Sequence, residues 1–447
     1  LYHEIKVAQF SGYVSEHSAY HHGEASLNGA IVNMAQTFVG SNNLNLLMPN
    51  GQFGTRLQGG DDSASERYIF TQLNPLTRCI FQEADDQVLK NQNDDGIMVE
   101  PEYYVPIIPM ALVNGVNGIG TGFSCSIPPF NIEDILRYLQ LMLKEESVQG
   151  FEFIPYYEGF KGQVMKTKDE GKFLIKGVYE KVDDNNIIIT ELPVGTWTMP
   201  YITFLEGIID NKKNQSIRDF NSLCTEVNVH IKITFNKGVL QSLEDDSDEY
   251  GVNGVHKLLK LTSSTNINNM HLFNDHCKLY KFKSVVEIIK THAVARLHYY
   301  KVRKQFLIDV LEKKYIKMTN KARYIQAILD DELDMRRKSR DEVERILETS
   351  AYDRVDDSYK YLIKMPMDSV TSENVKEIID ERDETKDEIE FIKDLTIEKM
   401  WYSELEIFQG EYRKFKEYRT RLQIAEAAAS EKPKKSTTKR KITKKKQ

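Results

Sequence analysis

The sequence has 447 residues, 40% of them hydrophobic and 28% charged, which is typical of a globular protein with long exposed helices and predicts two to four structural units. No apolar run approaches the ~18 residues of a membrane span, and residues 1–10 lack the pattern of a signal peptide, so we expect no membrane association. The four cysteines lie far apart without paired spacing, which predicts neither a disulfide framework nor a zinc site.

The net charge of −7 argues against nucleic-acid binding at the level of the whole chain. The charge is unevenly distributed, because residues 431–447 contain nine Lys or Arg and one Glu, which leaves −15 for residues 1–430. Even residues 1–130 are acidic, with five basic and thirteen acidic side chains. Any path for a nucleic acid must therefore be a local basic stripe.

The chain does not begin with methionine, and we expect it to be a segment of a longer protein, cut within a domain. Residues 1–130 predict helices and short strands with Gly-rich turns, including a helix over Ser26–Phe38, whereas residues 131–283 predict an α/β unit. The expected strands of that unit are Phe173–Ile175, Ile187–Ile189 and Val227–Phe235.

Long helices are predicted after Ser284, where apolar residues recur three and four positions apart, and again over Ser372–Ile397. Residues 320–361 between them predict a compact helical knob. Two long helices joined through a knob indicate an antiparallel coiled-coil arm, and two surface helices of a bundle are the alternative. The tail Glu431–Gln447 has no apolar period, so we expect disorder; its lysines suit a nuclear import signal, a DNA tether or a merely solvated tail.

Arg67-Tyr68 is the first candidate for chemistry, since it follows a polar turn that contains Gly59 and Gly60. Glycines there permit close approach of a phosphate. A tyrosine can act as a covalent nucleophile, but its ordinary pKa of ~10 requires cationic neighbours or a base, and Arg67 supplies a permanent charge. The alternative is a core tyrosine, because Ile69 and Phe70 follow it.

His21 and His22 lie in a segment, Tyr20–Glu24, rich in groups that titrate or donate near neutral pH. Adjacent helical residues point ~100° apart, so binding of one metal by both is unfavourable. Phosphate binding or proton transfer by one histidine is the functional interpretation, and a helix-capping polar segment is the alternative. We predict no metal site in the chain.

Ile119 is surrounded by four glycines in Asn114–Gly122. The spacing matches neither the P-loop nor the dinucleotide-binding fingerprint. An apolar side chain on such a loop is suited to wedging between base pairs, as in DNA-bending proteins. A plain tight turn is the alternative.

Six segments occur in order along the first 122 residues: Lys6-Val7-Ala8-Gln9, Tyr20-His21-His22-Gly23-Glu24, Phe38–Leu44, Gln52-Phe53-Gly54-Thr55-Arg56, Arg67–Thr71 and Asn114–Gly122. The series resembles the winged-helix domain of eukaryotic-type type II DNA topoisomerases. Glu191-Leu192-Pro193 and Thr196-Trp197-Thr198 resemble the tower domain of that family. The resemblance is strong over about residues 4–320 and weak beyond. It differs from bacterial gyrase-type relatives, which carry a Pro between the histidines.

The resemblance implies an α+β, multidomain fold with a winged-helix domain, an α/β tower, and a long antiparallel coiled-coil arm with a helical dimer gate. The implied ranges are 1–130 for the truncated winged-helix domain with the nucleophilic tyrosine, 131–283 for the tower, 284–319 for the first arm helix, 320–361 for the helical C-gate, 362–423 for the return helices and 424–447 for a basic disordered tail.

By resemblance, Tyr68 is the nucleophile that forms a 5′-phosphotyrosyl link, with Arg67 and His22 stabilising the developing charge. Lys6, His21 and Arg56 are implied contacts to double-stranded DNA, and Ile119 is the implied intercalating wedge. Three departures stand out: Asp61 replaces a usual Lys, Gly195 a usual Arg, and Phe123 with Tyr103 a usual Trp.

The implied activity is that of the DNA gate of an ATP-dependent type II topoisomerase, an isomerase acting as a nuclear homodimer. The family's ATPase and magnesium-binding domains do not match any part of this chain, so ATP and Mg²⁺ are expected in the parent enzyme and the fragment alone should cut DNA poorly. The alternative is a non-catalytic chromosome-scaffold protein of the same architecture. An intact Arg67-Tyr68 and His22 argue against it.

Overall fold

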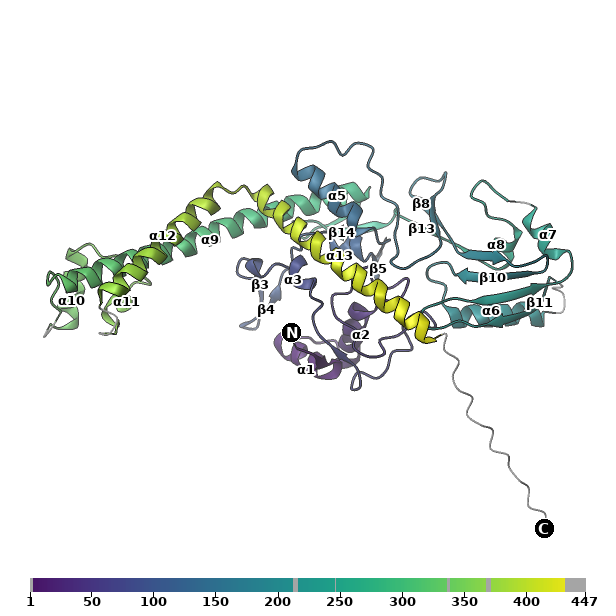
Figure 1. The fold of residues 1–447 in the computed structure, drawn as a ribbon, viewed down its shortest axis with the longest axis horizontal. Helices are drawn as coiled ribbons and strands as arrows, with labels where there is room; N and C mark the ends of the chain where they lie inside the picture. Colours follow the sequence, from purple (N-terminus) through teal and green to yellow (C-terminus); the bar gives the residue numbers. More distant parts are fainter. Residues whose placement is uncertain (1–2, 212–215, 246, 336–337, 367–370, 431–447) are drawn as a thin grey trace, which may run out of the picture. The chain divides into compact units, whose positions relative to one another are not determined.

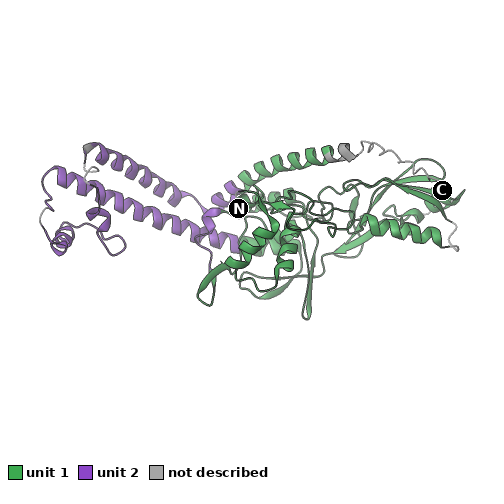
Figure 2. Ribbon diagram, turned by 90° about the horizontal axis from the view of Figure 1, so that it is seen from below, with its two compact units in different colours: residues 1–82, 91–293, 405–447 green, residues 83–90, 294–404 purple. Residues whose placement is uncertain are grey.

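The computed structural model describes residues 3–211, 216–245, 247–335, 338–366 and 371–430, which form two compact units (Figure 2). The first combines helices and strands, whereas the elements described in the second are helices. Unit 1 comprises residues 1–82, 91–293 and 405–447, and unit 2 comprises residues 83–90 and 294–404. The predicted mixture of helices and strands in a chain of more than one unit is confirmed. The basic tail, residues 431–447, lies outside the described residues.

The first part of unit 1 places two helices against a short two-stranded sheet (Figure 1). One apolar core joins both helices to Leu47, Phe53 and Ile69. The predicted helix is confirmed but ends at Ala35, because Gln36 takes an extended backbone conformation. The elements are β1 (Ile5–Lys6), α1 (Val7–His17), α2 (Glu24–Ala35) and β2 (Phe70–Thr71), which pairs antiparallel with β1.

Two β-hairpins and three short or amphipathic helices follow in unit 1. The last of these helices, α5, buries one apolar face and begins at a side-chain cap in which Asn131 accepts from the backbone of Glu133. The elements are α3 (Thr77–Ile80), β3 (Asn91–Asp94), β4 (Ile97–Pro101), α4 (Met110–Val113), β5 (Val116–Gly120), β6 (Phe123–Ile127) and α5 (Ile132–Leu143).

A four-stranded antiparallel sheet in the order β11-β12-β10-β9 contributes to an apolar core of unit 1. Alternate residues of its inner strands, such as Ile187 with Ile189 and Ile231 with Ile233, are fully buried, as the period of 2 predicts. The elements of this part are β9 (Val178–Lys181), β10 (Asn186–Glu191), α6 (Thr198–Asp210), β11 (Ile217–Ser222), β12 (Ile231–Phe235), α7 (Val239–Glu244) and α8 (Gly254–Leu258).

Two smaller antiparallel sheets complete the strands of unit 1. The strand predictions at residues 173–175 and 187–189 are confirmed as parts of β8 and β10, whereas β12 begins four residues later than predicted. The remaining strands are β7 (Gln163–Lys166), β8 (Lys172–Lys176), β13 (Thr262–Asn266), β14 (Met270–Phe273) and β15 (Leu279–Phe282).

Two long helices contribute to both units: α9 (Val285–Leu329) and α13 (Ile397–Ser430). Within unit 1, Arg419 of α13 donates to the backbone oxygens of Asn43 and Thr37 at 3.0 and 2.6 Å. Helix α13 extends to Ser430, so the expectation that the disordered tail begins at residue 424 is wrong for residues 424–430, which continue the helix.

In unit 2, α9 and α12 (Ser372–Asp394) lie side by side (Figures 1 and 2). Lys304 donates to the backbone oxygens of Lys393 and Leu395, while Thr385 approaches Met318, so the two helices run antiparallel. Helix α9 continues ten residues beyond the range predicted for the first arm helix.

The predicted helical knob of unit 2 has its own core, which includes Tyr324, Leu347 and Leu362. Its second helix begins at a capping box in which Ser339 and Glu342 exchange hydrogen bonds. The short elements of unit 2 are the 3₁₀ helix η1 (Glu83–Asp85), α10 (Arg340–Thr349) and α11 (Lys360–Ile363).

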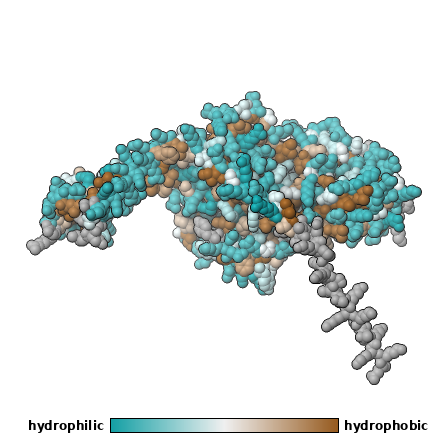
Figure 3. All heavy atoms as spheres, viewed as in Figure 1, coloured by the Kyte–Doolittle hydropathy of each residue, from teal (hydrophilic) through white to brown (hydrophobic). Residues whose placement is uncertain are grey.

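The surface in view in Figure 3 is largely hydrophilic, with hydrophobic side chains in separate small groups. Among the described residues, no helix combines the length and apolar character needed to cross a membrane.

Candidate active site

Tyr68 lies on the surface of unit 1 directly before β2, at the end of a long loop. Its side chain is 70% exposed, whereas the next residue, Ile69, is 1% exposed and belongs to the core beneath α1 and α2. The backbone N–H of Tyr68 donates to the oxygen of Ser65 at 2.9 Å. The interpretation of Tyr68 as a core tyrosine is therefore wrong.

The loop that ends in Tyr68 closes on itself through a series of hydrogen bonds. The backbones of Asn50 and Phe70 exchange bonds of 3.0 and 3.1 Å at its base. Farther along, the Asp62 carboxylate accepts from the backbone N–H and the hydroxyl of Thr55 at 2.8 and 2.5 Å. We call residues 50–70 the tyrosine loop. Its backbone is held by its own contacts, so the exposed Tyr68 stands on a fixed support.

Close packing of the backbone in the tyrosine loop requires glycine. A Cβ on Gly54, whose φ is +95°, would lie 2.4 Å from the backbone oxygen of Gly60. A Cβ on Gly60 would meet the buried side chain of Gln36, which donates to the Phe53 oxygen at 2.9 Å. Sequence reasoning does not single out Gln36, since one polar residue at a helix end gives no signal of its role.

Arg67 is exposed beside Tyr68, with its guanidinium carbon 5.6 Å from the centre of the Tyr68 ring. The guanidinium also donates from Nε to the Ser65 hydroxyl at 3.3 Å. Lys6 of β1 is exposed, and its Nζ lies 5.8 Å from the ring centre of Phe70 on the adjacent strand. Arg67 thus lies close to Tyr68, and Lys6 lies on the strand that pairs with β2.

The two histidines lie in the turn between α1 and α2, and both are exposed. The His22 ring packs edge-on against Tyr20 with centroids 5.5 Å apart, while His21 Nε2 lies 3.8 Å from a carboxylate oxygen of Asp94. The two histidines therefore have different protein partners. Within the described part of the chain, no hydrogen bond or ion pair joins His22 to Tyr68.

Arg56, which is predicted to contact DNA, is buried in this structure. Its side chain is 7% exposed and forms an ion pair with Glu191, which is 1% exposed. The same carboxylate accepts from the backbone N–H groups of Lys161 and Leu192 at 3.2 and 3.0 Å. A guanidinium neutralised in the interior cannot reach a phosphate without breaking this pair, so Arg56 is a structural residue in this conformation.

Ile119 has the geometry expected of a wedge. It is 92% exposed near the tip of the β5–β6 hairpin, where a Cβ on Gly118 or Gly122 would meet nothing within 4 Å. The other side of the hairpin is supported by Asn269, whose amide donates to the Ser124 hydroxyl at 2.8 Å and whose backbone oxygen accepts from Ser126 N at 2.8 Å. The apolar side chain is therefore presented on a braced hairpin rather than on a loose turn.

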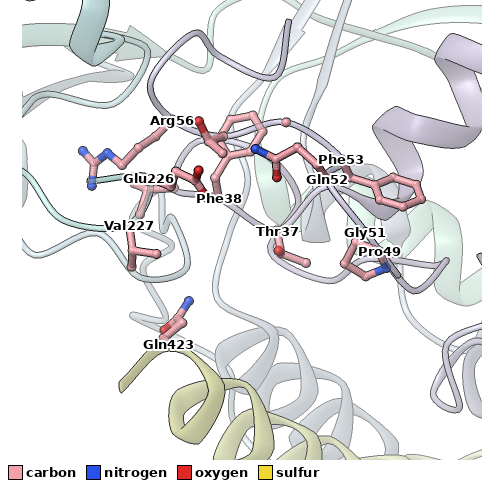
Figure 4. Close-up of a pocket in the computed structure, with 13 residues that line it drawn as sticks. Thr37, Phe38, Pro49, Gly51, Gln52, Phe53, Arg56, Glu226, Val227 and Gln423 are labelled. Atoms are coloured by element: carbon pink, nitrogen blue, oxygen red, sulfur yellow. The ribbon is translucent and has the colours of Figure 1, made fainter. Parts of the chain in front are cut away.

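A cavity of about 380 Å³ lies beside the tyrosine loop (Figure 4). It is lined by residues 51–56 of that loop, by Thr37 to Val39, by Glu226 with Val227, and by Gln423 of α13. Its walls mix polar and apolar groups, and it opens next to the segment that carries Arg56.

No group of three or more His, Cys, Asp or Glu side chains among the described residues is arranged to hold a metal ion. We therefore derive no step through a metal held by the described residues. All four cysteines, which lie in the described part, are free.

An exposed tyrosine beside an arginine and a braced apolar hairpin tip suit a DNA-processing protein. The family model of the DNA gyrase and topoisomerase IV A-chains matches residues 2–406, and the chain belongs to this family. The chain is 37% identical over 441 residues to "DNA topoisomerase 2" of Plasmodium falciparum, covering 91% of this chain and 31% of that protein.

The corresponding protein of Pisum sativum is 36% identical over 452 residues, covering 92% of this chain and 30% of its own length. The fold matches the crystal structure of the Plasmodium falciparum topoisomerase II DNA-binding, cleavage and re-ligation domain with a TM-score of 0.84 at 36% identity, covering 94% of this chain and 60% of that one. The predicted resemblance to eukaryotic-type enzymes is confirmed. The chain spans about a third of the length of these curated relatives.

Proposed function

We propose that this chain is the DNA-gate portion of a type II DNA topoisomerase, in which Tyr68 breaks and rejoins one strand of a duplex. The observation that carries the proposal is the placement of Tyr68, which is 70% exposed beside Arg67 while its neighbour Ile69 is locked in the core. A nucleophile that must reach a DNA phosphate needs exposure of the side chain and fixation of the backbone together.

The reaction is a transesterification. The phenol oxygen of Tyr68 attacks a DNA phosphorus, the bond from phosphorus to the 3′-oxygen breaks, and that oxygen takes up a proton as the phenol loses one. The product is a 5′-phosphotyrosyl link and a free 3′-hydroxyl. Because one phosphoester bond replaces another, the reverse step reseals the strand without an external energy source.

Charge develops on the phosphate oxygens during attack, and fixed cations near them lower the barrier. We assign this role to Arg67 and, through an exposed imidazole, to His22. Lys6 and His21 are proposed contacts to the DNA backbone. Ile119 is the proposed wedge that kinks the duplex, at a cost offset by the contacts that bent DNA makes with the protein.

The finer architecture is part of the proposal: a winged-helix domain over residues 1–130, a tower over 131–283, and a coiled-coil arm made by α9 with α12 that carries the gate of a homodimer. Support comes from the antiparallel packing of these two helices. Mg²⁺ and ATP are proposed to be bound by other parts of the parent enzyme. A nuclear location is proposed from relatives of eukaryotes, one of which is described as mitochondrial.

The test joins this chain to the magnesium-binding region of a DNA topoisomerase 2 relative and incubates it with Mg²⁺ and supercoiled plasmid. Detergent traps covalent complexes, and peptide mapping finds the residue linked to a 5′-phosphate. We expect Tyr68, with no adduct in Tyr68→Phe. Tyr13→Phe is the matched control, because Tyr13 is also exposed, at 58%, and lies on α1. DNA binding without any adduct would instead favour a non-catalytic scaffold protein, which no observation on this chain supports at present.

A further inference from the structure

The tip of the tyrosine loop rests on the start of α6. The first N–H groups of a helix have no partner within the helix. Here those of Thr198 and Met199 donate to the backbone oxygens of Arg56 and Leu57 at 3.2 and 2.9 Å. The loop thus completes the N-terminus of α6, and the position of its tip is tied to that helix.

A buried ion pair fixes the same tip to the end of β10. Glu191 is the last residue of β10, and its carboxylate binds the Arg56 guanidinium with both side chains almost fully buried. Two backbone N–H groups, of Lys161 and Leu192, also donate to this carboxylate, so its orientation is set from three directions. A paired interior charge of this kind resists displacement, because separation leaves an uncompensated charge.

Trp197, which precedes α6, packs against glycine in the tip. A Cβ on Gly59 would lie 2.4 Å from the indole ring, and one on Gly40 would lie 3.2 Å from it. The indole also meets the Phe38 ring edge-on, with centroids 5.7 Å apart. The loop tip is therefore fixed by backbone hydrogen bonds, by an ion pair and by an aromatic ring so close to Gly59 that a Cβ there would clash.

Hydrogen bonds inside the loop carry this fixation towards Tyr68. Thr55, next to Arg56, is bound twice by Asp62, and the N–H of Ala64 donates to the Gln52 oxygen at 2.9 Å. Four residues later comes Tyr68. A shift of the tip by a displaced Arg56 would thus move the segment that leads into the nucleophile.

We propose that Glu191 and Trp197 are positioning residues for strand cleavage, which fix the far end of the tyrosine loop on the β10–α6 segment and so set the place of the Tyr68 hydroxyl. This rests on the proposed role of Tyr68. Neither residue touches the DNA in the proposal, and their effect passes through the loop. The variants should therefore lower the cleavage rate and leave DNA binding unchanged.

The experiment measures single-turnover adduct formation against DNA concentration in the fused protein described above, for Glu191→Gln and Trp197→Ala. Because a displacement of ~1 Å costs about 100-fold in rate, we expect the rate at saturating DNA to fall by up to about 100-fold. The DNA concentration at half-saturation should not change. Trp197→Phe, which keeps an aromatic ring, should recover most of the rate.

Hydrogen exchange on the full chain alone gives a readout that needs no cleavage. We expect faster exchange within residues 52–68 in both variants and in Gly59→Ala. Gly150→Ala is the matched control, since Gly150 also has a positive φ, +77°, but a Cβ there meets nothing within 4 Å. In a Trp197→Ala background, Gly59→Ala should do less harm than in the wild type, because the clash is gone.

Trp197 is only half-buried, so Trp197→Ala carries the test if Glu191→Gln does not fold. Wild-type adduct rates and exchange in the variants would overturn this inference while leaving Tyr68 as the nucleophile. A fall in the rate accompanied by an equal rise in the DNA concentration at half-saturation would also overturn it, since this would indicate a general loss of structure. An adduct that persists in Tyr68→Phe would overturn the proposed function and this inference together.

Discussion

Replacing Asp85 with Asn tests the buried charge cluster that holds unit 2 together. The carboxylate of Asp85, in η1, accepts from Arg296 at 2.6 Å and from Arg303 at 3.2 Å, both on α9. The three side chains are 5%, 0% and 2% exposed. Glu404 supplies the second carboxylate by pairing with Arg303. Two cations and two anions thus balance in the interior.

The expected loss of stability follows from this balance of buried charges. Tyr300 lies between the guanidinium groups, 4.0 and 4.5 Å from its ring centre, and burial raises its pKa, so it remains a neutral donor to Glu404. Asp85→Asn therefore leaves two buried cations facing one carboxylate. Breaking a buried pair by removal of one partner costs about 3–5 kcal/mol, and we expect a loss of stability of that size in unit 2.

Urea unfolding followed by tryptophan fluorescence measures the change. The chain has two tryptophans, and Trp401 is fully buried in unit 2 against Tyr300. In a Trp197→Phe background the fluorescence reports on unit 2 alone. Glu83→Gln is the control, because Glu83 is an exposed carboxylate in the same short helix. A loss below about 1 kcal/mol, the value of an exposed pair, would refute the argument.

Two further predictions concern unit 1. Burial and the charge of Lys176 lower the pKa of His256 from 6.5 to about 4, against the opposing effect of Asp248. The neutral form therefore stabilises the fold above pH 6.5, and up to about 3 kcal/mol of folding free energy is lost as the pH falls towards 4. His256→Gln should flatten the pH dependence of the unfolding midpoint, and the same pH dependence in the variant would contradict this. Ile119→Ala should bend a fluorophore-labelled duplex less and bind it about 1–2 kcal/mol more weakly. Ile97→Ala, which also changes an exposed isoleucine in a hairpin, should change neither bending nor binding. Equal bending by both variants would contradict the role of Ile119 as a wedge.

The elements that the sequence predicts well are those whose apolar pattern is local. β8 and β10 come from short apolar runs, and α9 from apolar residues three and four apart. The predicted start of β12 is too early, because Thr225 and Asn228 close a turn through their backbones and the Thr225 hydroxyl. The predicted end of α13 is too early for the opposite reason: helix continues to Ser430 through an Ala-rich stretch of high helix propensity.

The residues of the candidate site differ in the same way: some are predicted by local patterns, and others depend on distant contacts. Tyr68 and Ile119 are recognisable from local motifs, and their exposure suits the roles predicted for them. The ion pair of Arg56 could not be predicted, because sequence reveals a charge but not its burial, and the partner Glu191 lies 135 residues away. A contact so distant in the chain leaves no periodic signal. The same limit hides the packing of Trp197 on Gly59.

The structure also shows why an exposed tyrosine can lie next to a buried isoleucine, which composition alone does not explain. An apolar run such as Tyr68-Ile69-Phe70 suggests a core strand, yet in extended backbone successive side chains point to opposite faces. Ile69 and Thr71 are 1% and 0% exposed and follow this alternation, whereas Tyr68 lies in the turn before them, where its N–H donates to the oxygen of Ser65, and its side chain is exposed. The buried Ile69 thus anchors the backbone next to the exposed Tyr68. In the proposed function, the accuracy with which Tyr68 is placed also depends on what holds the far end of the tyrosine loop.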